Sequence, residues 1–262
     1  MRQMAELVFL GTGASTGIPL IGCTCSVCSH ADGPNVRLRP SVFLKIENKQ
    51  FVIDVGPDFR TQALKYGIKQ LDGVLITHVH FDHIAGIDDL RAYYFLQKRP
   101  MPCLISETDF DLLKGRYGYL FQKPDDKTVG IARIDFQVLG NEQGHQRFEG
   151  VQVQYMTFDH GNMQVTGYRF GDLAYITDIK EYDDSLLECL RGINTLIVSA
   201  LRHEHSSVHF TVDEAVKFAQ VVGAKQTYLT HIAHEIDHES TDHDLPEGIQ
   251  IAYDGLKVKF NL

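Results

Sequence analysis

Three histidines and one aspartate with metal-ligand chemistry stand close together in the stretch Thr-His-Val-His-Phe-Asp-His at residues 77–83. His78 and His80 are two residues apart, so on an extended or turning backbone their rings can converge on one ion. Asp82 and His83 then point elsewhere and can serve a second ion nearby. Imidazole and carboxylate groups are ligands that Zn, Mn and Fe accept. The stretch therefore predicts a metal site, with an exposed His-rich loop as the simpler alternative.

The apolar residues before this stretch indicate how it is held. Gly73 to Thr77 has the β-favouring residues of a buried strand. Open α/β sheets place their chemistry at the carboxyl ends of strands. His160, Asp178 and His231 also come directly after predicted strands. Each is a weak signal alone, but together they indicate that one edge of the sheets gathers several potential metal ligands.

The rest of the chain consists of strand-rich halves with intervening helices, which suggests two sheets packed together with helices outside. Asp54 lies at the end of a predicted strand, where its carboxylate could accept a hydrogen bond from a metal-bound histidine or cap the next turn. Thr211 and Glu214 form a capping box that opens a helix over Val212 to Val222. Near the end, the sequence Tyr-Asp-Gly-Leu at 253–256 predicts a type I′ hairpin turn between two alternating runs.

Three thiols form a second cluster. Cys23, Cys25 and Cys28 lie within six residues, a spacing that in a cytosolic protein favours metal binding over disulfides. Three thiolates need a fourth ligand to close a tetrahedral structural zinc site, and spacing alone does not name it. Three unliganded, reduced cysteines are the alternative.

Composition limits the class of protein. The 262 residues are 44% hydrophobic and carry a formal net charge of −9, and we treat 1–262 as a single domain. The acidic balance argues against a long nucleic-acid track, whereas bound metal ions could still attract a small anionic substrate. The N-terminal apolar run is too short for a signal sequence, and no stretch approaches the roughly 20 apolar residues of a membrane helix. We therefore expect a cytoplasmic protein without membrane attachment.

Four short motifs resemble the metallo-β-lactamase superfamily across nearly the whole chain: His-x-His-x-Asp-His, Asp-His-Gly at 159–161, Thr-Asp at 177–178 and Leu-Thr-His at 229–231. The resemblance implies an αββα four-layer sandwich, an α+β fold in which two mixed β-sheets carry helices on their outer faces. It also implies a binuclear metal site in the cleft at one sheet edge. One ion would be held by His78, His80 and His160, the other by Asp82, His83 and His231, with Asp178 bridging them.

A finer resemblance concerns the cysteines. Together with Leu-Thr-His-Ile-Ala-His at 229–234, they resemble the PhnP type of cyclic phosphodiesterase. In that group, three cysteines and a histidine three residues past the last active-site ligand form a structural zinc site. The resemblance thus implies His234 as the fourth ligand, within a small structural-zinc loop near 22–39. His209, followed by Phe-Thr, matches the histidine that tRNase Z-like phosphodiesterases use beside the metals; a surface histidine is the alternative.

The resemblance implies a metal-dependent hydrolase with two divalent metals in the active site, Zn or Mn, and one structural Zn. It would cleave a small phosphodiester, with a cyclic phosphate as one candidate, by attack of a metal-bridging hydroxide. Asp82 would orient the hydroxide while ligating. A protonated His209 would stabilise phosphoryl charge or protonate the leaving alkoxide.

Two other functions are compatible with the same fold: a glyoxalase II-like thioesterase with the same seven ligands, and a non-catalytic metal- or cofactor-handling protein. The motifs at His209 and at the cysteines favour the phosphodiesterase. The chain lacks a Lys/Arg/Gly-rich insertion like the arm with which tRNase Z grips tRNA, so we expect a small phosphate-containing substrate and no long nucleic acid. The stretch Tyr93 to Lys127, expected to roof the cleft, carries no motif for a particular ligand. The sequence leaves a homodimer open.

Overall fold

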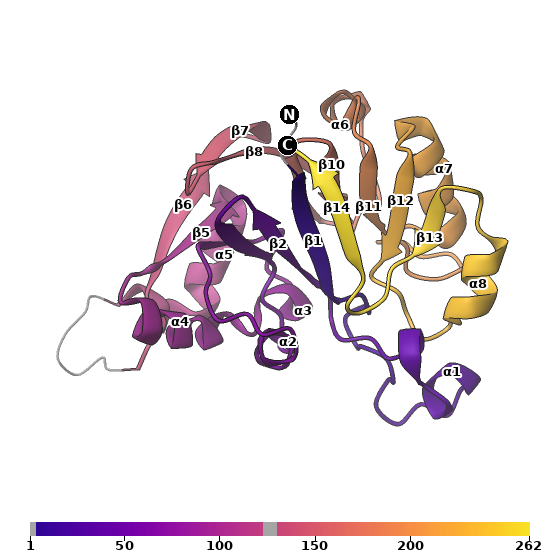
Figure 1. The fold of residues 1–262 in the computed structure, drawn as a ribbon, viewed down its shortest axis with the longest axis horizontal. Coiled ribbons are helices and arrows are strands. Elements are labelled where there is room, and N and C mark those ends of the chain that lie inside the picture. The colour runs from indigo at the N-terminus through magenta and orange to yellow at the C-terminus, as the bar shows by residue number, and fades with distance from the viewer. Residues whose placement is uncertain (1–3, 123–129) are drawn as a thin grey trace.

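Two β-sheets form the centre of the molecule (Figure 1). The structure, a computed structural model, describes residues 4–122 and 130–262. In spatial order the first sheet contains β14 (Lys257–Asn261), β1 (Met4–Gly11), β2 (Ser41–Ile46), β3 (Lys49–Ile53), β4 (Gly73–Leu75), β5 (Met101–Ser106) and β6 (Ile134–Leu139). The second contains β13 (Ile249–Ile251), β12 (Gln226–Thr230), β11 (Thr195–Ser199), β10 (Leu173–Ile176), β9 (Met163–Phe170), β8 (Val151–His160) and β7 (Gln143–Phe148).

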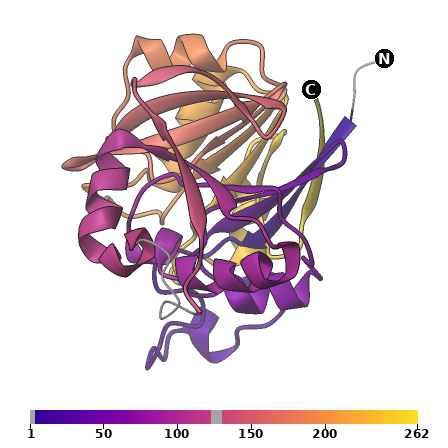
Figure 2. The same cartoon turned by 90° about the vertical axis from the view of Figure 1, so that its left-hand side faces the viewer.

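Helices lie on the outer sides of both sheets, as Figures 1 and 2 show together. The α-helices are α1 (Ser26–Ser29), α2 (Phe59–Lys65), α3 (Phe81–Ile84), α4 (Arg91–Gln97), α5 (Glu107–Arg116), α6 (Asp184–Leu190), α7 (Val212–Val222) and α8 (His238–Asp244). The described 3₁₀ helices are η1 (Gly33–Asn35), η2 (Ile87–Leu90) and η3 (Gly118–Phe121). The expected capping box of α7 is present, with Thr211 accepting from the backbone of Glu214.

Strand β1 shows how one segment serves two cores. Leu7 and Phe9 are buried between the sheets, in a cluster with residues of both. Val8 and Leu10 belong to a second cluster, which side chains of α2, α4 and α5 complete. Successive side chains of a strand point to opposite faces, so an apolar residue at every position requires cover on both faces. A third cluster joins α6 and α7 to the outer face of the second sheet. The expected four-layer αββα arrangement is confirmed.

Both sheets are mixed, and their parallel portions place the site. Strands β3 to β6 pair in parallel in the first sheet, as do β10 to β13 in the second. Two contacts fasten the second sheet to the end of β4. The hydroxyl of Tyr168 donates to the carbonyl of Ile76 (2.6 Å), and the N–H of Thr166 donates to the carbonyl of Thr77 (2.9 Å). The His-rich stretch therefore starts from a point held by both sheets.

The prediction of a hairpin at 253–256 is wrong. Strand β13 before the turn pairs with β12 in the second sheet, whereas β14 after it pairs with β1 in the first. Only Gly255 of the two central residues has a positive φ (101°), and a type I′ turn requires one at both. The carboxylate of Asp254 instead accepts hydrogen bonds from the N–H groups of Thr12 (2.9 Å) and Leu38 (2.8 Å). These contacts direct the chain from one sheet to the other.

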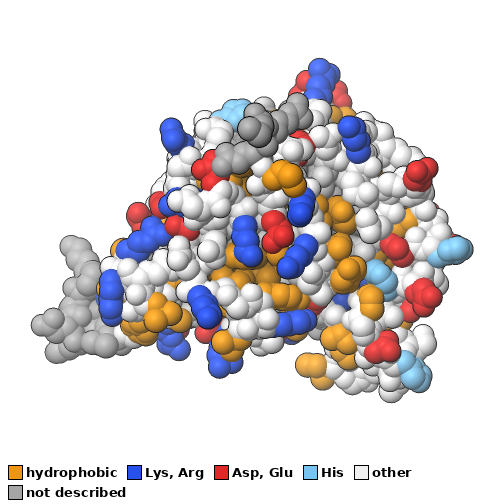
Figure 3. Space-filling model, viewed as in Figure 1, with side chains coloured by type: hydrophobic (Ala, Val, Ile, Leu, Met, Phe, Trp, Pro, Cys, Tyr) orange, Lys and Arg blue, Asp and Glu red, His pale blue; other side chains and the backbone are white. Residues whose placement is uncertain are grey.

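Charged and apolar side chains are mixed on one face of the molecule. In Figure 3, Lys and Arg side chains are spread among acidic and apolar ones, and the described part of this face has no continuous basic strip. Within residues 4–122 and 130–262, each helix is too short or too polar to cross a bilayer. The stretch Tyr93 to Lys127, expected to roof the cleft, contains α4, β5, α5 and η3, and its last five residues lie outside the described part.

Candidate metal centre

Loops from both sheets bring all the predicted ligands to one edge of the sandwich. The segment that leads from β4 into α3 carries four of them, the ends of β8, β10 and β12 contribute one each, and a loop before α7 adds a histidine. Most of these side chains are buried, while those of His80 and His209 are partly exposed. The converging residues are His78, His80, Asp82, His83, His160, Asp178, His209 and His231.

Asp178 lies at the middle of this cluster. Its Oδ1 is 3.1 Å from Nε2 of His231 and 3.3 Å from Nδ1 of His209. Its Oδ2 is 3.2 Å from Nε2 of His83. Asp82 closes the group, with its Oδ2 3.3 Å from both His83 Nε2 and His231 Nε2. The two oxygens of Asp178 thus face different imidazoles, and its carboxylate also lies within 4.8 Å of ligand nitrogens of His78 and His160, so it is close to both expected ligand groups.

The other expected ligand group lies beside it. Nε2 of His78 is 3.0 Å from Nδ1 of His80. The ring centroid of His160 is 5.2 Å from that of His80 and 5.9 Å from that of His78. His160 is also 4.5 Å, centroid to centroid, from His209. These three predicted ligands therefore surround a common space next to Asp178.

Protonated imidazoles balance the buried carboxylates in this arrangement. Burial lowers the pKa of His83, but the carboxylates of Asp82, Asp178 and Asp54 raise it well above its ordinary value. Burial raises the pKa of Asp178, yet His231 and His83 bring it well below its usual range. Metal ligation needs neutral imidazole and ionised carboxylate. Bound divalent cations would therefore take the place of the protons on the imidazoles, and positive charge would still balance the buried carboxylates.

The donor set fits divalent metals for a second reason. Among the described residues, buried Nε2 of His83 and buried Nδ1 of His160 and His209 have no hydrogen-bond partner. An unpaired buried polar atom is costly, and a metal bond is one way to satisfy it. Nitrogen and carboxylate donors alone accept Zn and Mn alike.

Three residues in or beside the cluster have a strained backbone. Asp54, Asp178 and His231 have φ values of 65°, 57° and 60°, in the left-handed region. Each follows the end of a strand, β3, β10 and β12 respectively. A non-glycine residue in such a region costs on the order of 1–3 kcal/mol and persists where the surroundings over-determine it. The strand ends thus turn sharply to aim their side chains into the site, which no sequence pattern indicated.

Asp54 contacts one of the predicted ligands, His83, as the first of its two predicted roles requires. Its carboxylate accepts from Nδ1 of His83 (2.7 Å) and from the N–H and hydroxyl of Thr77 (2.8 and 2.7 Å). It is fully buried and does not cap the helix that follows, whose N-cap position is Asp58, a residue with no side-chain capping hydrogen bond. The hydrogen bond fixes the proton on Nδ1 of His83 and leaves Nε2 for the cluster.

Two supporting residues were missed from the sequence. The carboxylate of Asp109, near the start of α5, accepts from the N–H of Val79 (3.1 Å) and the hydroxyl of Ser106 (2.6 Å). The guanidinium of Arg116, at the end of the same helix, donates to the carbonyl of Val79. Val79 separates His78 from His80, so both polar groups of the intervening residue are held. The sequence pattern Ser-x-x-Asp at 106–109 is typical of a helix start, but it does not indicate this long-range contact.

The cysteine cluster also forms. Cys23 Sγ and Cys25 Sγ are each 3.5 Å from Nδ1 of His234, and Cys28 completes a group of four potential ligand atoms. Backbone N–H groups, among them that of Leu20 (3.3 Å from Cys28 Sγ), point at the sulfurs. The hydrogen bond with His234 lowers the pKa of Cys25 to about 6, while burial raises that of Cys28 to about 11. A cation would stabilise all three thiolates.

Comparison with known proteins agrees with this site. A family model described as a β-lactamase superfamily domain matches residues 49–232. The chain belongs to this β-lactamase superfamily. Within it, the chain is similar to a new diphosphatase from the PhnP family: the solved structure is 40% identical, has a TM-score of 0.91 and covers 100% of this chain and 99% of its own.

Two further relatives are more distant in length or sequence. The octanoyltransferase of Porphyromonas gingivalis (strain ATCC BAA-308 / W83) is 33% identical over an alignment of 262 positions, which covers 96% of this chain and 51% of that protein. The chain thus spans about half the length of this relative. The structure of Zn(2+)-bound PqqB from Methylobacterium extorquens shares the fold, with a TM-score of 0.77 and 17% identity over 97% of this chain and 99% of that one.

These similarities confirm the resemblance to the metallo-β-lactamase superfamily, its PhnP-like branch and the fold. They also confirm the expected class of metal-dependent hydrolase. The superfamily fold implies divalent metal binding, and the clusters described above could hold such ions.

Asp109 provides a test through pH. Burial raises its pKa from 3.8 to about 6, so its contribution to stability is fully present below the unfolded pKa and is lost as pH rises through the folded one. The unfolding free energy of the wild type, relative to Asp109→Asn, should fall by about 3 kcal/mol between about pH 4 and pH 7. Urea unfolding at several pH values measures this difference. Asp111→Asn, exposed on the same helix, is the control. If the difference in unfolding free energy between the wild type and Asp109→Asn did not change with pH, the pKa of Asp109 would not be raised in the folded protein.

Asp54 provides a second test. Asn tolerates the left-handed backbone, so Asp54→Asn should fold while its hydrogen bond to His83 loses the charge. We expect metal affinity to fall by about 10–100-fold, measured by metal retention against a competing chelator. Asp58→Asn, which breaks only the pair with Arg39 outside the site, should retain metal like the wild type. If Asp54→Asn retained metal as well as the wild type, Asp54 would not support metal binding through His83.

Proposed function

We propose that this protein hydrolyses small phosphodiesters, including cyclic phosphates, at a site with two divalent metals, Zn or Mn. The observation that carries the proposal is the placement of Asp178, whose carboxylate lies within 4.8 Å of ligand nitrogens of His78 and His160 in one group and 3.2 Å from Nε2 of His83 in the other. The full-length similarity to a PhnP-family diphosphatase supports phosphoryl chemistry over thioester chemistry.

The ligand roles are those that the resemblance to the superfamily implies. The histidines around the first space would hold one ion, the Asp82 group would hold the other, and Asp178 would contribute to both. The metals would supply an activated water and would neutralise charge on the phosphoryl oxygens. The first group is His78, His80 and His160, and the second is Asp82, His83 and His231.

His209 is the residue best placed to handle a proton. Its side chain is 13% exposed, and its ring lies 4.5 Å from His160 and 4.9 Å from His231, centroid to centroid. Burial lowers the pKa of His209 to about 3, against the opposing effect of Asp178, so the ring is neutral at pH 7 in this structure. A bound phosphate anion would raise that pKa. The ring would then donate its proton to the leaving alkoxide.

The cysteine cluster would hold a structural zinc. Three sulfurs and one imidazole nitrogen form a closed donor set with no place for substrate. His234 follows His231 by three residues, so this zinc would brace the turn that carries an active-site ligand.

The first experiment compares substrates on protein reconstituted with Zn or Mn. We expect turnover of bis(p-nitrophenyl) phosphate or of a diphosphate diester, and none of S-lactoylglutathione. His209→Ala should lower kcat on the diester by about 10²–10⁴-fold with unchanged metal content. His205→Ala is the matched control, because His205 is exposed in the same loop.

The other outcomes are equally informative. Hydrolysis of the thioester with a silent diester would replace the proposal with the glyoxalase II-like function. Silence on all three substrates with both metals bound would favour the non-catalytic role. Normal turnover by His209→Ala would show that His209 has no role in the mechanism, but it would leave the proposed phosphodiesterase activity intact.

The zinc site is tested by metal counting. Cys28→Ser should lose about one zinc per chain and unfold at lower temperature, because a structural zinc contributes folding free energy. Elemental analysis and thermal unfolding measure both effects. Cys189→Ser, outside the cluster, should retain the wild-type zinc content. Full zinc content in Cys28→Ser would show that these thiols do not form the site.

A further inference from the structure

The loop that carries His209 has little regular structure of its own. Residues 201–210 lie between β11 and α7 and form neither helix nor strand. Yet Nδ1 of His209 lies 3.3 Å from Oδ1 of Asp178, at the middle of the ligand cluster. A proton donor must lie within hydrogen-bond reach of the atom that takes the proton. The position of His209 therefore depends on contacts that fasten this loop to the segment of Asp178.

A backbone contact joins the two segments. The N–H of Phe210, next to His209, donates to the carbonyl of Ile179, next to Asp178 (3.0 Å). The carbonyl of Phe210 in turn accepts from the N–H of Leu201 (2.9 Å), which closes the base of the loop. One hydrogen bond between the segments fixes a distance but not an orientation. A second contact is needed to set the direction of the imidazole.

An ion pair between the same two segments supplies this second contact. Nζ of Lys180 lies 2.9 and 3.1 Å from the two carboxylate oxygens of Glu214. Lys180 is the second residue after Asp178, and Glu214 lies in the first turn of α7, directly beyond the loop. The Lys180 side chain is only 13% exposed. Because a buried ammonium needs a partner, the carboxylate of Glu214 holds it in place.

Glu214 is fixed from a second direction. One of its carboxylate oxygens also accepts from the N–H of Thr211 (2.8 Å), which is the reciprocal bond of the capping box that opens α7. Thr211 is the second residue after His209. Glu214 therefore connects the ammonium of Lys180 to the backbone just beyond His209.

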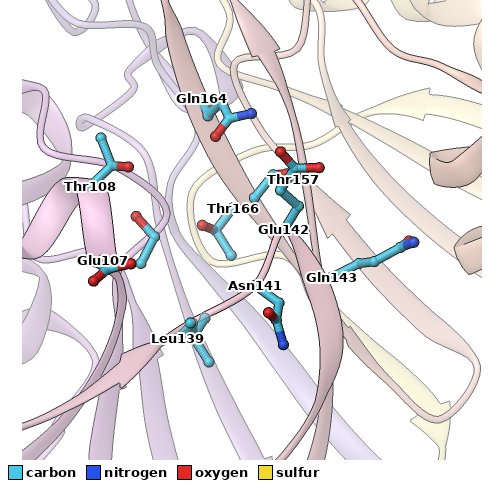
Figure 4. Close-up of a pocket in the computed structure, with 11 residues that line it drawn as sticks. Glu107, Thr108, Leu139, Asn141, Glu142, Gln143, Thr157, Gln164 and Thr166 are labelled. Atoms are coloured by element: carbon cyan, nitrogen blue, oxygen red, sulfur yellow. The ribbon is translucent and has the colours of Figure 1, made fainter.

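Lys180 also contacts the segment of a third candidate ligand. Its N–H donates to the carbonyl of Asp159 (3.0 Å), which directly precedes His160. Cavities of about 500 and 220 Å³ lie beside this end of β8, and both are lined by Thr157 and Gln164 (Figure 4). None of the residues described as lining them is a candidate metal ligand. Packing is thus open beside this strand end, and the contact with Lys180 helps to hold it.

We propose that Lys180 and Glu214 are positioning residues, whose ion pair holds the loop of His209 against the segment of Asp178 and so aims the imidazole. The inference rests on the proposed hydrolysis of phosphodiesters, in which His209 donates the proton. The Glu214 side chain is 38% exposed, so solvent screens the pair and its contribution to the unfolding free energy is small. Loss of the pair should therefore lower kcat without unfolding the protein or releasing metal.

Variants of both residues test the proposal in the holoenzyme with bis(p-nitrophenyl) phosphate as the substrate. Glu214→Gln keeps an oxygen for the capping bond but loses the charge, and Lys180→Met removes the ammonium. Each should lower kcat by about tenfold, because a catalytic group is misplaced, with KM changed by less than about twofold and metal content unchanged. Lys180→Arg, which restores the charge and the bonds to the carboxylate, should recover most of the lost kcat.

The His209→Ala background separates positioning from a general structural role. If the pair acts through His209, Lys180→Met should change the kcat of His209→Ala by less than about twofold, because the effects of residues that act as a unit do not add. Lys49→Met is the matched control. Lys49 pairs with Asp72 (3.1 Å), whose carboxylate also accepts a backbone N–H, that of Gln50 (3.0 Å). This pair lies outside the site, so the control should keep the wild-type kcat.

Failure of this inference is distinguishable from failure of the proposed function. A normal kcat in Lys180→Met and Glu214→Gln, loss of metal from either, or an equal effect of Lys180→Met with and without His209 would overturn the inference and keep the phosphodiesterase. If the wild type hydrolyses no diester, the phosphodiesterase fails, and hydrogen exchange decides on the ion pair. The amide of Phe210 should then exchange about tenfold faster in both variants than in the wild type. An unchanged exchange rate would overturn the inference.

Discussion

The burial of Asp178 among imidazoles is the constraint on which the rest of the structure depends. A carboxylate removed from water is stable only where positive charge and hydrogen-bond donors surround it. His83 and His231 meet this need from two separate loops, and the ring of His209, from a third loop, lies beside the same carboxylate. Those loops must therefore be held to within a few tenths of an ångström, although each belongs to a different part of the chain. The two-sheet sandwich is the frame that achieves this.

The sandwich positions the ligands through residues that contact the ligands or their neighbours in the chain. Asp54 orients His83, Asp109 and Arg116 hold the residue between the first two histidines, and the hydroxyl of Tyr168 fastens the end of β4 to the opposite sheet. These contacts are buried and hydrogen-bonded, so they are rigid. Rigidity allows strand ends such as that at Asp178 to keep a left-handed backbone, because the surrounding bonds offset its cost.

The ligand cluster supplies the chemistry but does not by itself select a substrate. It is compatible with hydrolysis of many esters, since metals polarise any phosphoryl or acyl group. Discrimination must come from the residues that surround it. The turn from His231 to His234 links the cluster to the cysteine site. A structural metal there would stiffen the same edge without touching the substrate.

The sequence by itself indicated the candidate ligands and determined the class of fold. Motif spacing within 77–83 and residues at strand ends are local properties, and apolar alternation reports burial directly, so both could be read from one chain. Only the tertiary structure decided how the candidate ligands share space and brought Asp109 into contact with Val79. It also overturned the hairpin at 253–256, where hydrogen bonds from residues far away along the chain outweigh local turn preference. Such contacts depend on three-dimensional packing, which sequence spacing does not encode locally.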